Sequence, residues 1–239
     1  MDFSEAERRG LYRAIHERRD VRSCFLPDPI PDPVLARILD AAHHAPSVGF
    51  MQPWDFIVIR DLSIRRAVQQ NFERANSAAS PLYSGNQREL YNSLKLAAIL
   101  DAPINLCITC DASRAKGSGL GRQTVPETVV YSTVCAVQNL WLAARAEGLG
   151  AGWVSILDLD VLRGILGIPE SVIPVAYLCL GYVSEFGSQP ELEERGWETR
   201  EPIENLLHFD RWGARDEHRA RELTREPCVK SKSSSQAAS

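Results

Sequence analysis

The sequence predicts one three-layer domain, α/β or α+β, in which helices cover both sides of a sheet. Segments with helical apolar spacing alternate with short strand-like apolar runs along most of the chain. The 239 residues fit one large domain or two small ones, and no internal repeat divides them. Interleaved helices and strands of this kind place a sheet between two layers of helices.

The first elements are set by capping residues and prolines. Ser4 and Glu7 form a capping box, and a helix is predicted from there to about Arg18. Residues 26–33 contain four prolines and form a rigid, extended connection that cannot be helical. A second helix is predicted over 34–43, because the chain reaches Ala-Pro directly after it.

The remaining elements follow from apolar periodicity. The longest helical pattern, 126–147, is apolar on all sides, which indicates a place in the core or against a partner subunit. A polar stretch over 76–86 and a glycine-bearing loop over 111–124 interrupt the pattern. The other predicted elements are helices over 62–75, 87–100 and 159–166, strands over 56–59, 104–110, 153–157 and 175–183, and a closing segment over 201–207.

The C-terminal stretch differs in composition from the rest. From Ala214 onward, 26 residues carry ten charges, no aromatic residue and a serine-rich end. Such a segment cannot bury enough apolar surface to fold by itself. We therefore expect a domain over 1–213 and a disordered tail over 214–239.

Composition excludes several classes of function. The net charge of −4 argues against nucleic acid as the main partner. No apolar run approaches the roughly 18 residues of a membrane span, and the charged first residues do not resemble a signal peptide, so a cytoplasmic location is expected. Of 27 basic residues, 23 are arginine, a side chain suited to phosphate, although codon bias alone accounts for the excess.

Cysteines and histidines do not indicate a metal or redox site. Cys107 and Cys110 have the C-x-x-C spacing but lie in a predicted strand, where residues three apart point to opposite faces. No second pair completes a zinc site, and reduced thiols packed in the core are expected. His43 and His44 are adjacent, and one of them is expected to be a satisfied structural residue. No metal site is predicted.

The glycine clusters do not form a dinucleotide-binding motif. In Gly117-Ser-Gly-Leu-Gly121 the third glycine comes one residue too early, and the next helical pattern starts only at Pro126. Gly148-Leu-Gly-Ala-Gly152 follows a helix, where the motif must follow a strand, and therefore indicates a helix stop. P-loop, H-E-x-x-H and G-x-S-x-G motifs are also missing from the sequence.

Three segments carry chemistry that these exclusions leave open. Arg18, Arg19 and Arg22 could grip a phosphate, or they could cap a solvated helix end with Asp20 as a plain ion partner. The loop over 45–54 combines small residues, prolines and an indole, and could reach a flat polar ring or be an ordinary turn. The segment over 150–155 places the Ser155 hydroxyl beside small residues, either at a ligand or on the backbone.

Together these segments resemble the nitroreductase-like flavoprotein family. There an R-R-S-x-R-x-F segment, an A-P-S-x-x-N-x-Q-P-W loop and a late glycine-rich segment bind FMN. The resemblance covers about residues 8–210, and Arg200 is similar to the last phosphate-contacting arginine of the family. It implies an α+β fold with a mixed, mostly antiparallel sheet flanked by helices, and a homodimer with FMN in the cleft between subunits.

One branch of that family is particularly similar to this chain, over 130–148 and the following Gly-Trp-Val-Ser-Ile. Asp20 replaces the serine of the first motif, and the 45–54 loop lacks the usual asparagine. The branch fragments reduced FMN, as a substrate, with molecular oxygen to 5,6-dimethylbenzimidazole, the lower ligand of vitamin B12, and erythrose 4-phosphate. A separate flavin reductase would then supply the reduced FMN.

The resemblance implies a role for each matching residue. Asp20 would be the base near the ribityl chain, and Ser155 would lie near N5 and C1′ of the flavin. A lid over about 78–96 would shield the site from water. The implied FMN-binding residues are Arg18, Arg19, Asp20, Val21, Arg22, Ser47, Met51, Gln52, Leu96, Gly152, Trp153, Ser155 and Arg200.

Two other functions compete with this one. An NAD(P)H-dependent nitroreductase or flavin reductase would keep its FMN bound and intact. A non-enzymatic FMN-binding module would bind reduced FMN and leave it unchanged in air.

Overall fold

A computed structural model of the chain describes residues 2–225. The chain divides into two compact units. The larger unit, Glu17–Glu191, contains the whole sheet and the two longest helices, and the smaller comprises Met1–His16 and the chain from Leu192 onward.

The sheet of the larger unit has four strands in the order β1-β2-β4-β3, and all three neighbouring pairs are antiparallel. These strands are β1 (Trp54–Ile59), β2 (Ile104–Asp111), β3 (Leu149–Val154) and β4 (Val172–Tyr182). Seven of the eight residues of β2 are buried, as expected for a central strand covered on both faces. The mostly antiparallel α+β architecture implied by the family resemblance is confirmed.

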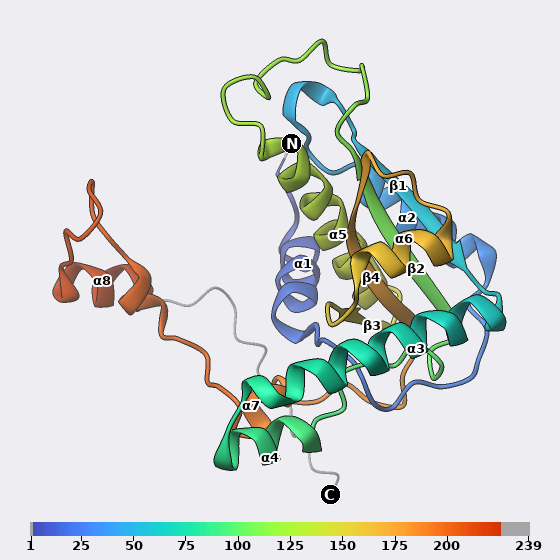
Figure 1. The fold of residues 1–239 in the computed structure, drawn as a ribbon. Coiled ribbons are helices and arrows are strands. Elements are labelled where there is room, and N and C mark those ends of the chain that lie inside the picture. The colour runs from blue at the N-terminus through green and yellow to red at the C-terminus, as the bar shows by residue number, and fades with distance from the viewer. Residues whose placement is uncertain (1, 226–239) are drawn as a thin grey trace, which may run out of the picture. The chain divides into compact units, whose positions relative to one another are not determined.

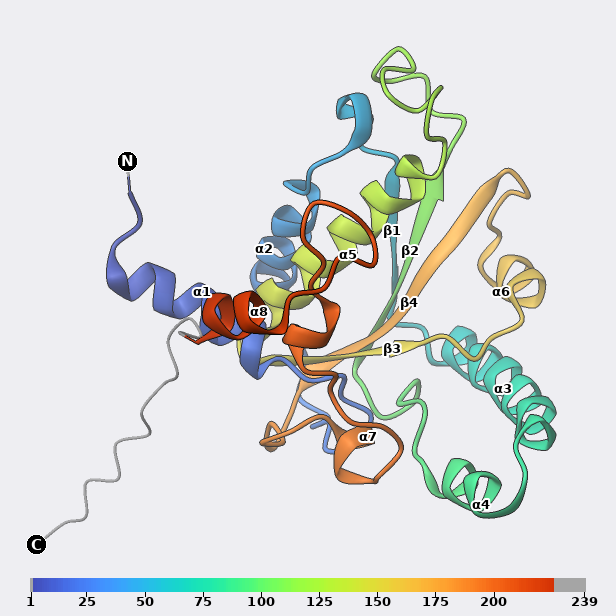
Figure 2. The same ribbon diagram turned by 90° about the vertical axis from the view of Figure 1, so that its left-hand side faces the viewer.

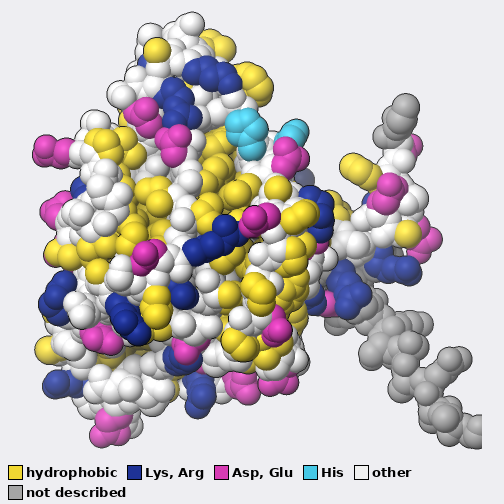
Figure 3. Space-filling view, turned by 90° about the vertical axis from the view of Figure 1, so that its right-hand side faces the viewer, with side chains coloured by type: hydrophobic (Ala, Val, Ile, Leu, Met, Phe, Trp, Pro, Cys, Tyr) yellow, Lys and Arg dark blue, Asp and Glu magenta, His cyan; other side chains and the backbone are white. Residues whose placement is uncertain are grey.

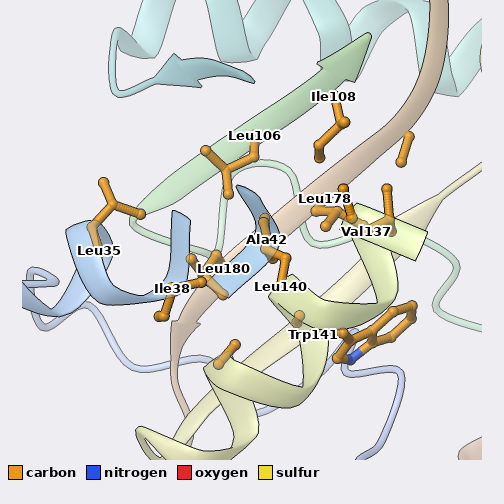
Figure 4. Close-up of a cluster of buried hydrophobic side chains, with 14 of the residues drawn as sticks. Leu35, Ile38, Ala42, Leu106, Ile108, Val137, Leu140, Trp141, Leu178 and Leu180 are labelled. Carbon is orange, nitrogen blue, oxygen red and sulfur yellow. The ribbon is translucent and has the colours of Figure 1, made fainter. Parts of the chain in front are cut away.

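Helices α2 (Asp32–His43) and α5 (Thr128–Ala146) cover one face of the sheet, as Figures 1 and 2 show. Their apolar side chains form one buried cluster with β2 and β4, drawn in Figure 4. Ile38 of α2 and Leu140 of α5 are fully buried there. Helix α5 also keeps Tyr131 and Val134 exposed, at 58% and 40%, so the core does not absorb all of its apolar surface.

Helices α3 (Leu62–Ala79) and α6 (Leu159–Leu166) cover the other face, with the turn η2 (Ser80–Leu82) and helix α4 (Gly85–Ser93) following α3. Their cluster includes Val68, Phe72 and Leu162. Asn71 is buried beside them, and its side-chain amide exchanges two hydrogen bonds with the backbone of Asp158 at the start of α6, at 2.8 and 3.0 Å. This pairing joins the two helices.

Several element boundaries differ from the sequence prediction. Helix α4 ends at Ser93, where the sequence predicted a helix to residue 100, because the apolar residues 96–99 pack in the core cluster of α3 without helical structure. Strand β3 begins at Leu149, although two of its glycines were interpreted as a helix stop. Gly148, with φ of 78°, does end α5. Helix α2 begins at Asp32, so a proline occupies its first turn, which a helix tolerates.

The cysteines pack as the strand alternation predicts. Cys107 lies in the core cluster of α3, whereas Cys110 lies in a separate cluster with Met51 and Val129. Both are free thiols, and burial raises the pKa of Cys107 to about 12, which keeps it protonated. Cys228 lies outside the described residues.

The smaller unit contains regular structure where the sequence predicted disorder. It holds most of α1 (Glu5–Glu17) and α7 (Glu191–Glu194), together with η3 (Ile203–Leu206) and α8 (Glu217–Thr224). Asp216 caps α8 by accepting a hydrogen bond from the Arg219 backbone at 2.9 Å, and Arg219 stacks on Phe209 at 4.3 Å. These local contacts give the stretch up to residue 225 a fold that its composition does not indicate, and 226–239 lie outside the described residues.

Candidate active site

The segment after α1 lies directly against strand β3. Asp20 forms a parallel bridge with Ala151, and the Val21 N–H donates to the Ala151 carbonyl oxygen at 3.0 Å. Gly152 permits this approach, because a Cβ there would lie 2.1 Å from the Val21 carbonyl oxygen. The glycine spacing of β3 therefore reflects close backbone approach to this segment.

The Asp20 carboxylate is held on both of its oxygens. Oδ1 accepts a hydrogen bond from the Trp153 N–H at 2.9 Å, and Oδ2 pairs with Nη2 of Arg22. Its side chain keeps 31% of its surface exposed. Burial raises the pKa of Asp20 above its usual value, against the opposing effects of Arg22, the Trp153 N–H and Arg18. The result is a carboxylate that accepts a proton more readily than an exposed aspartate.

Arg18 and Arg22 supply positive charge on either side of Asp20. The Arg18 guanidinium lies over the Trp141 ring at 5.2 Å. The Arg22 side chain is 12% exposed, and its buried Nε has no hydrogen-bond partner in the described part of the chain. The positive charge that these two guanidinium groups bring to the segment suits an anionic group such as the phosphate of FMN.

Arg19 is placed differently from its neighbours. Its guanidinium nitrogens Nε and Nη2 donate to the carbonyl oxygens of Gly187 and Ser188 at 2.9 and 2.6 Å, and Nη1 donates to the Arg18 carbonyl oxygen at 2.8 Å. In this arrangement the side chain ties the chain after β4 to the arginine segment. Its predicted contact with phosphate stays a prediction.

The 45–54 loop contains the short helix η1 (Val48–Phe50) and is held by hydrogen bonds from both ends. The Ser47 hydroxyl accepts from the Gln52 N–H at 3.1 Å, and the Val48 N–H donates to the Ser132 hydroxyl of α5 at 3.0 Å. Met51 is buried beneath the loop at 2% exposure. At the end of the loop, the Trp54 indole N–H donates to His43 Nδ1 at 3.1 Å. This bond confirms a structural role for His43.

Within one chain, the 45–54 loop and the arginine segment contact α5 at different points along the helix. Ser132 contacts the 45–54 loop, while the indole N–H of Trp141 donates to the Arg19 carbonyl oxygen at 3.3 Å. Nine residues of α-helix separate the two contacts by about 14 Å. The structure therefore brings Asp20, Val21 and the arginines together with Gly152 and Trp153, but not with Ser47, Met51 and Gln52.

Ser155, Leu96 and Arg200 each have surroundings of their own. Ser155 is exposed just beyond β3 and lines a cavity of about 160 Å³ with Trp153 and Tyr177. Leu96 packs half-buried against the core cluster of α3. Arg200 belongs to the smaller unit, where its N–H contacts Glu193 Oε1 at 3.4 Å. Ser155, Leu96 and Arg200 keep their predicted roles as predictions.

Sequence reasoning missed Trp141. This residue contacts both Arg18 and the Arg19 backbone, yet its position in an apolar helix gives no sign of a site. Only its distance from the arginines in space identifies it.

The described part of the chain was predicted to carry no metal site and no membrane span. Among residues 2–225, no group of three or more His, Cys, Asp or Glu side chains could hold a metal ion. No helix in the same range has the length and apolar character needed to cross a membrane. On the face of the larger unit in Figure 3, acidic and basic side chains are interspersed and do not form an extended basic field.

The chain is similar to known proteins over most of its length. The Nitroreductase family model matches residues 15–182. The chain is 44% identical to the 5,6-dimethylbenzimidazole synthase of Rhodospirillum rubrum over 200 residues, which cover 84% of this chain and 94% of the relative. It is 40% identical to the enzyme of the same name from Rhodobacter capsulatus over 204 residues, covering 85% and 98%.

The fold also matches solved structures of low sequence identity. Iodotyrosine deiodinase bound to FMN and 3-iodo-L-tyrosine has a TM-score of 0.68 at 20% identity, over 84% of this chain and all of that one. The NfrA1 nitroreductase of B. subtilis has a TM-score of 0.64 at 16% identity, over 89% and 80%. The matched residues include the arginine segment, the 45–54 loop and the whole sheet, and on these grounds the chain belongs to the nitroreductase family.

Proposed function

We propose that this chain fragments reduced FMN in the presence of oxygen and releases 5,6-dimethylbenzimidazole, erythrose 4-phosphate and the remaining pyrimidine part of the flavin ring as a third fragment. The relatives named 5,6-dimethylbenzimidazole synthase, at 40–44% identity over most of the chain, support this activity over the alternatives. The observation that carries it is the half-buried Asp20 carboxylate, docked on β3 between two cationic side chains. Reduced FMN is the substrate, and it supplies both the electrons for oxygen and the atoms of the product.

Asp20 acts as the base at C1′ of the ribityl chain in this proposal. An ordinary exposed aspartate is a weak base at neutral pH, because its proton affinity is low. Burial raises the pKa of Asp20 and moves it toward the range in which a carboxylate accepts a proton usefully. The Trp153 N–H fixes one oxygen, so the carboxylate is oriented before the substrate arrives.

The arginines bind the phosphate end of the substrate. Arg18 and Arg22 flank Asp20 along the chain and supply the positive charge for the anion. Arg19 and Arg200 complete the set implied by the family. The hydroxyl of Ser155, beyond β3, lies at the reacting edge of the flavin ring, and Val21, Gly152 and Trp153 form the wall beside the base.

A lid over residues 78–96 excludes water from the reaction. Its core is held by stacking of Tyr83 on Tyr91 at 4.6 Å between ring centroids. The Tyr91 hydroxyl donates to Asn76 Oδ1 of α3 at 2.6 Å, and the Ser80 hydroxyl donates to Asn92 Oδ1 at 2.8 Å. A small packed element on the end of a long helix is suited to cover a site, since closure protects reactive species from water.

A homodimer completes the site. Exposed apolar side chains lie on the 45–54 loop, on the segment between β2 and α5, and at the start of α5, namely Phe50, Leu120, Val125 and Tyr131. Large exposed apolar patches are typical of interfaces. In the proposed dimer a second copy covers them and contributes its 45–54 loop to the arginine segment. The cytoplasmic location and the separate flavin reductase remain predictions.

One experiment separates the candidate functions. Purified protein is mixed with FMN, a separate flavin reductase and air, and 5,6-dimethylbenzimidazole is measured by mass spectrometry. We expect product with the wild type, whereas Asp20→Asn should bind FMN and form little product. With the separate reductase left out, consumption of reduced nicotinamide with nitroaromatics while FMN survives would establish a nitroreductase. FMN that binds and persists in air would establish a binding module, and either result would overturn the proposal.

A further inference from the structure

The loop over 112–124 joins β2 to α5 and has no part in the proposed chemistry. It contains the glycine cluster that does not fit a dinucleotide-binding motif. Gly117, Gly119 and Gly121 all have positive φ, at 82°, 76° and 82°, so the cluster serves a specific backbone path. That path runs along the 45–54 loop, which carries predicted flavin contacts.

The two loops meet backbone to backbone. A Cβ on Gly117 would lie 2.3 Å from the Gly49 carbonyl oxygen, and a Cβ on Gly49 would lie 2.7 Å from the Leu120 carbonyl oxygen. Both distances are shorter than any side chain tolerates. The glycines of the two loops are therefore matched to each other across this contact.

Arg114 and Arg122 fasten the contact with side-chain donors. Nη1 of Arg114 donates to the carbonyl oxygens of Gln52 and Trp54 at 2.5 and 3.2 Å, and Nη2 pairs with Asp55 Oδ2 at 2.6 Å. Nη1 of Arg122 lies 3.5 Å from the Met51 sulfur. One guanidinium thus holds three acceptors along the end of the 45–54 loop.

The loop that Arg114 holds is strained. Phe50 and Gln52 are not glycines, yet their φ angles are 53° and 50°. Side chains disfavour this left-handed region, and such residues persist where surrounding contacts over-determine the backbone. The Gln52 carbonyl, one of the atoms that Arg114 grips, belongs to one of these two residues.

We propose that Arg114 is a positioning residue that holds the 45–54 loop in its flavin-binding conformation before flavin arrives. The inference rests on the proposed role of this loop in binding the flavin ring. Without the three bonds of Arg114, the strained turn relaxes toward ordinary backbone angles and the binding-competent conformation becomes a minority. The apparent affinity falls by the same factor as the competent population, so a population of about 1–10% weakens binding about 10- to 100-fold.

The test compares full-length Arg114→Ala and Arg114→Lys with the wild type. Arg60→Ala is the control, because Arg60 pairs with Asp32 on the exposed surface of the same unit, away from both loops. Dissociation constants for FMN and for riboflavin are measured by flavin fluorescence well below the unfolding temperature. Hydrogen exchange of residues 48–53 is measured in the flavin-free and FMN-saturated proteins.

We expect Arg114→Ala to weaken the binding of FMN and of riboflavin equally, because in the proposed function the loop contacts the ring and not the phosphate. Lysine should recover part of the affinity, since it reaches one or two carbonyls but lacks the planar fork. Exchange of residues 48–53 should rise in flavin-free Arg114→Ala and return to the wild-type rate with FMN. The control should behave as the wild type in every measurement.

Three results would overturn the positioning role. They are unchanged flavin affinity in folded Arg114→Ala, unchanged exchange over 48–53, and a loss confined to FMN, which would indicate direct phosphate contact. A wild type that binds flavin but makes no dimethylbenzimidazole would refute the proposed function and leave the positioning result standing. A wild type that binds no flavin would refute both.

Discussion

Gly152 offers a sharp test of the site, because the structure leaves no room for a methyl group there. In Gly152→Ala the new Cβ would lie 2.1 Å from the Val21 carbonyl oxygen. Real Cβ atoms keep at least 3.0 Å from such neighbours, so the arginine segment and β3 must separate by about 0.9 Å. Asp20, the proposed base, moves with that segment.

The loss of folding stability follows from the two hydrogen bonds that this separation breaks. The Val21 N–H to Ala151 bond of 3.0 Å and the Trp153 N–H to Asp20 bond of 2.9 Å would both stretch beyond hydrogen-bonding distance. A neutral bond contributes about 0.5–1.5 kcal/mol and one to a charged group about 1.5–3 kcal/mol, so the loss is roughly 2–4.5 kcal/mol. For a chain of this size the unfolding midpoint falls by roughly 4–18 °C.

The assay pairs thermal unfolding with formation of dimethylbenzimidazole, measured below the lower midpoint. Gly164→Ala is the matched control, since Gly164 lies inside α6 with nothing within 4 Å of its added Cβ. That control should raise stability by about 0.5–1 kcal/mol, because alanine suits a helix interior better than glycine. A Gly152→Ala protein with wild-type midpoint and product yield would refute the close approach of the two segments and the positioning of Asp20.

Three further predictions concern the base, the core and the lid. Product formation should fall as pH drops through the pKa of Asp20, which lies above the ordinary 3.8, because only the deprotonated carboxylate accepts a proton. This decrease at low pH should be absent from the pH–rate profile of the residual activity of Asp20→Asn. If the decrease persists there, another group is responsible for it. Asn71→Ala should lower the free energy of unfolding by about 2 kcal/mol in urea, since the Asp158 N–H loses its acceptor and the Asp158 carbonyl oxygen keeps only the Leu162 N–H. An unchanged midpoint would contradict that account. Tyr91→Phe removes the bond to Asn76 and should speed hydrogen exchange over residues 85–93 with little change in global unfolding, whereas wild-type exchange there would show that this bond does not hold the lid.

The sequence predicted the fold where apolar spacing is regular and failed where tertiary contacts override it. Strand β2 and helix α6 were predicted almost to the residue, because periodicity alone distinguishes them. Residues 96–99 were predicted as helix, since a short apolar run fits both a helix and buried irregular chain. The sequence did not predict helix α8, because the segment is rich in charged residues and was therefore expected to be disordered. The structure shows that Asp216 caps this helix and that Arg219 contacts Phe209.

For the site, the sequence by itself determined the chemical groups and the family, since motif order along the chain does not depend on how the chain folds. Only the tertiary structure decided what each group does. It showed that Gly152 is needed for backbone approach, and that Arg19 ties down the chain after β4. It also placed Asp20 on the Trp153 amide, more than 130 residues away along the chain. Such roles depend on burial and on distances between remote residues, and neither quantity is encoded in local spacing.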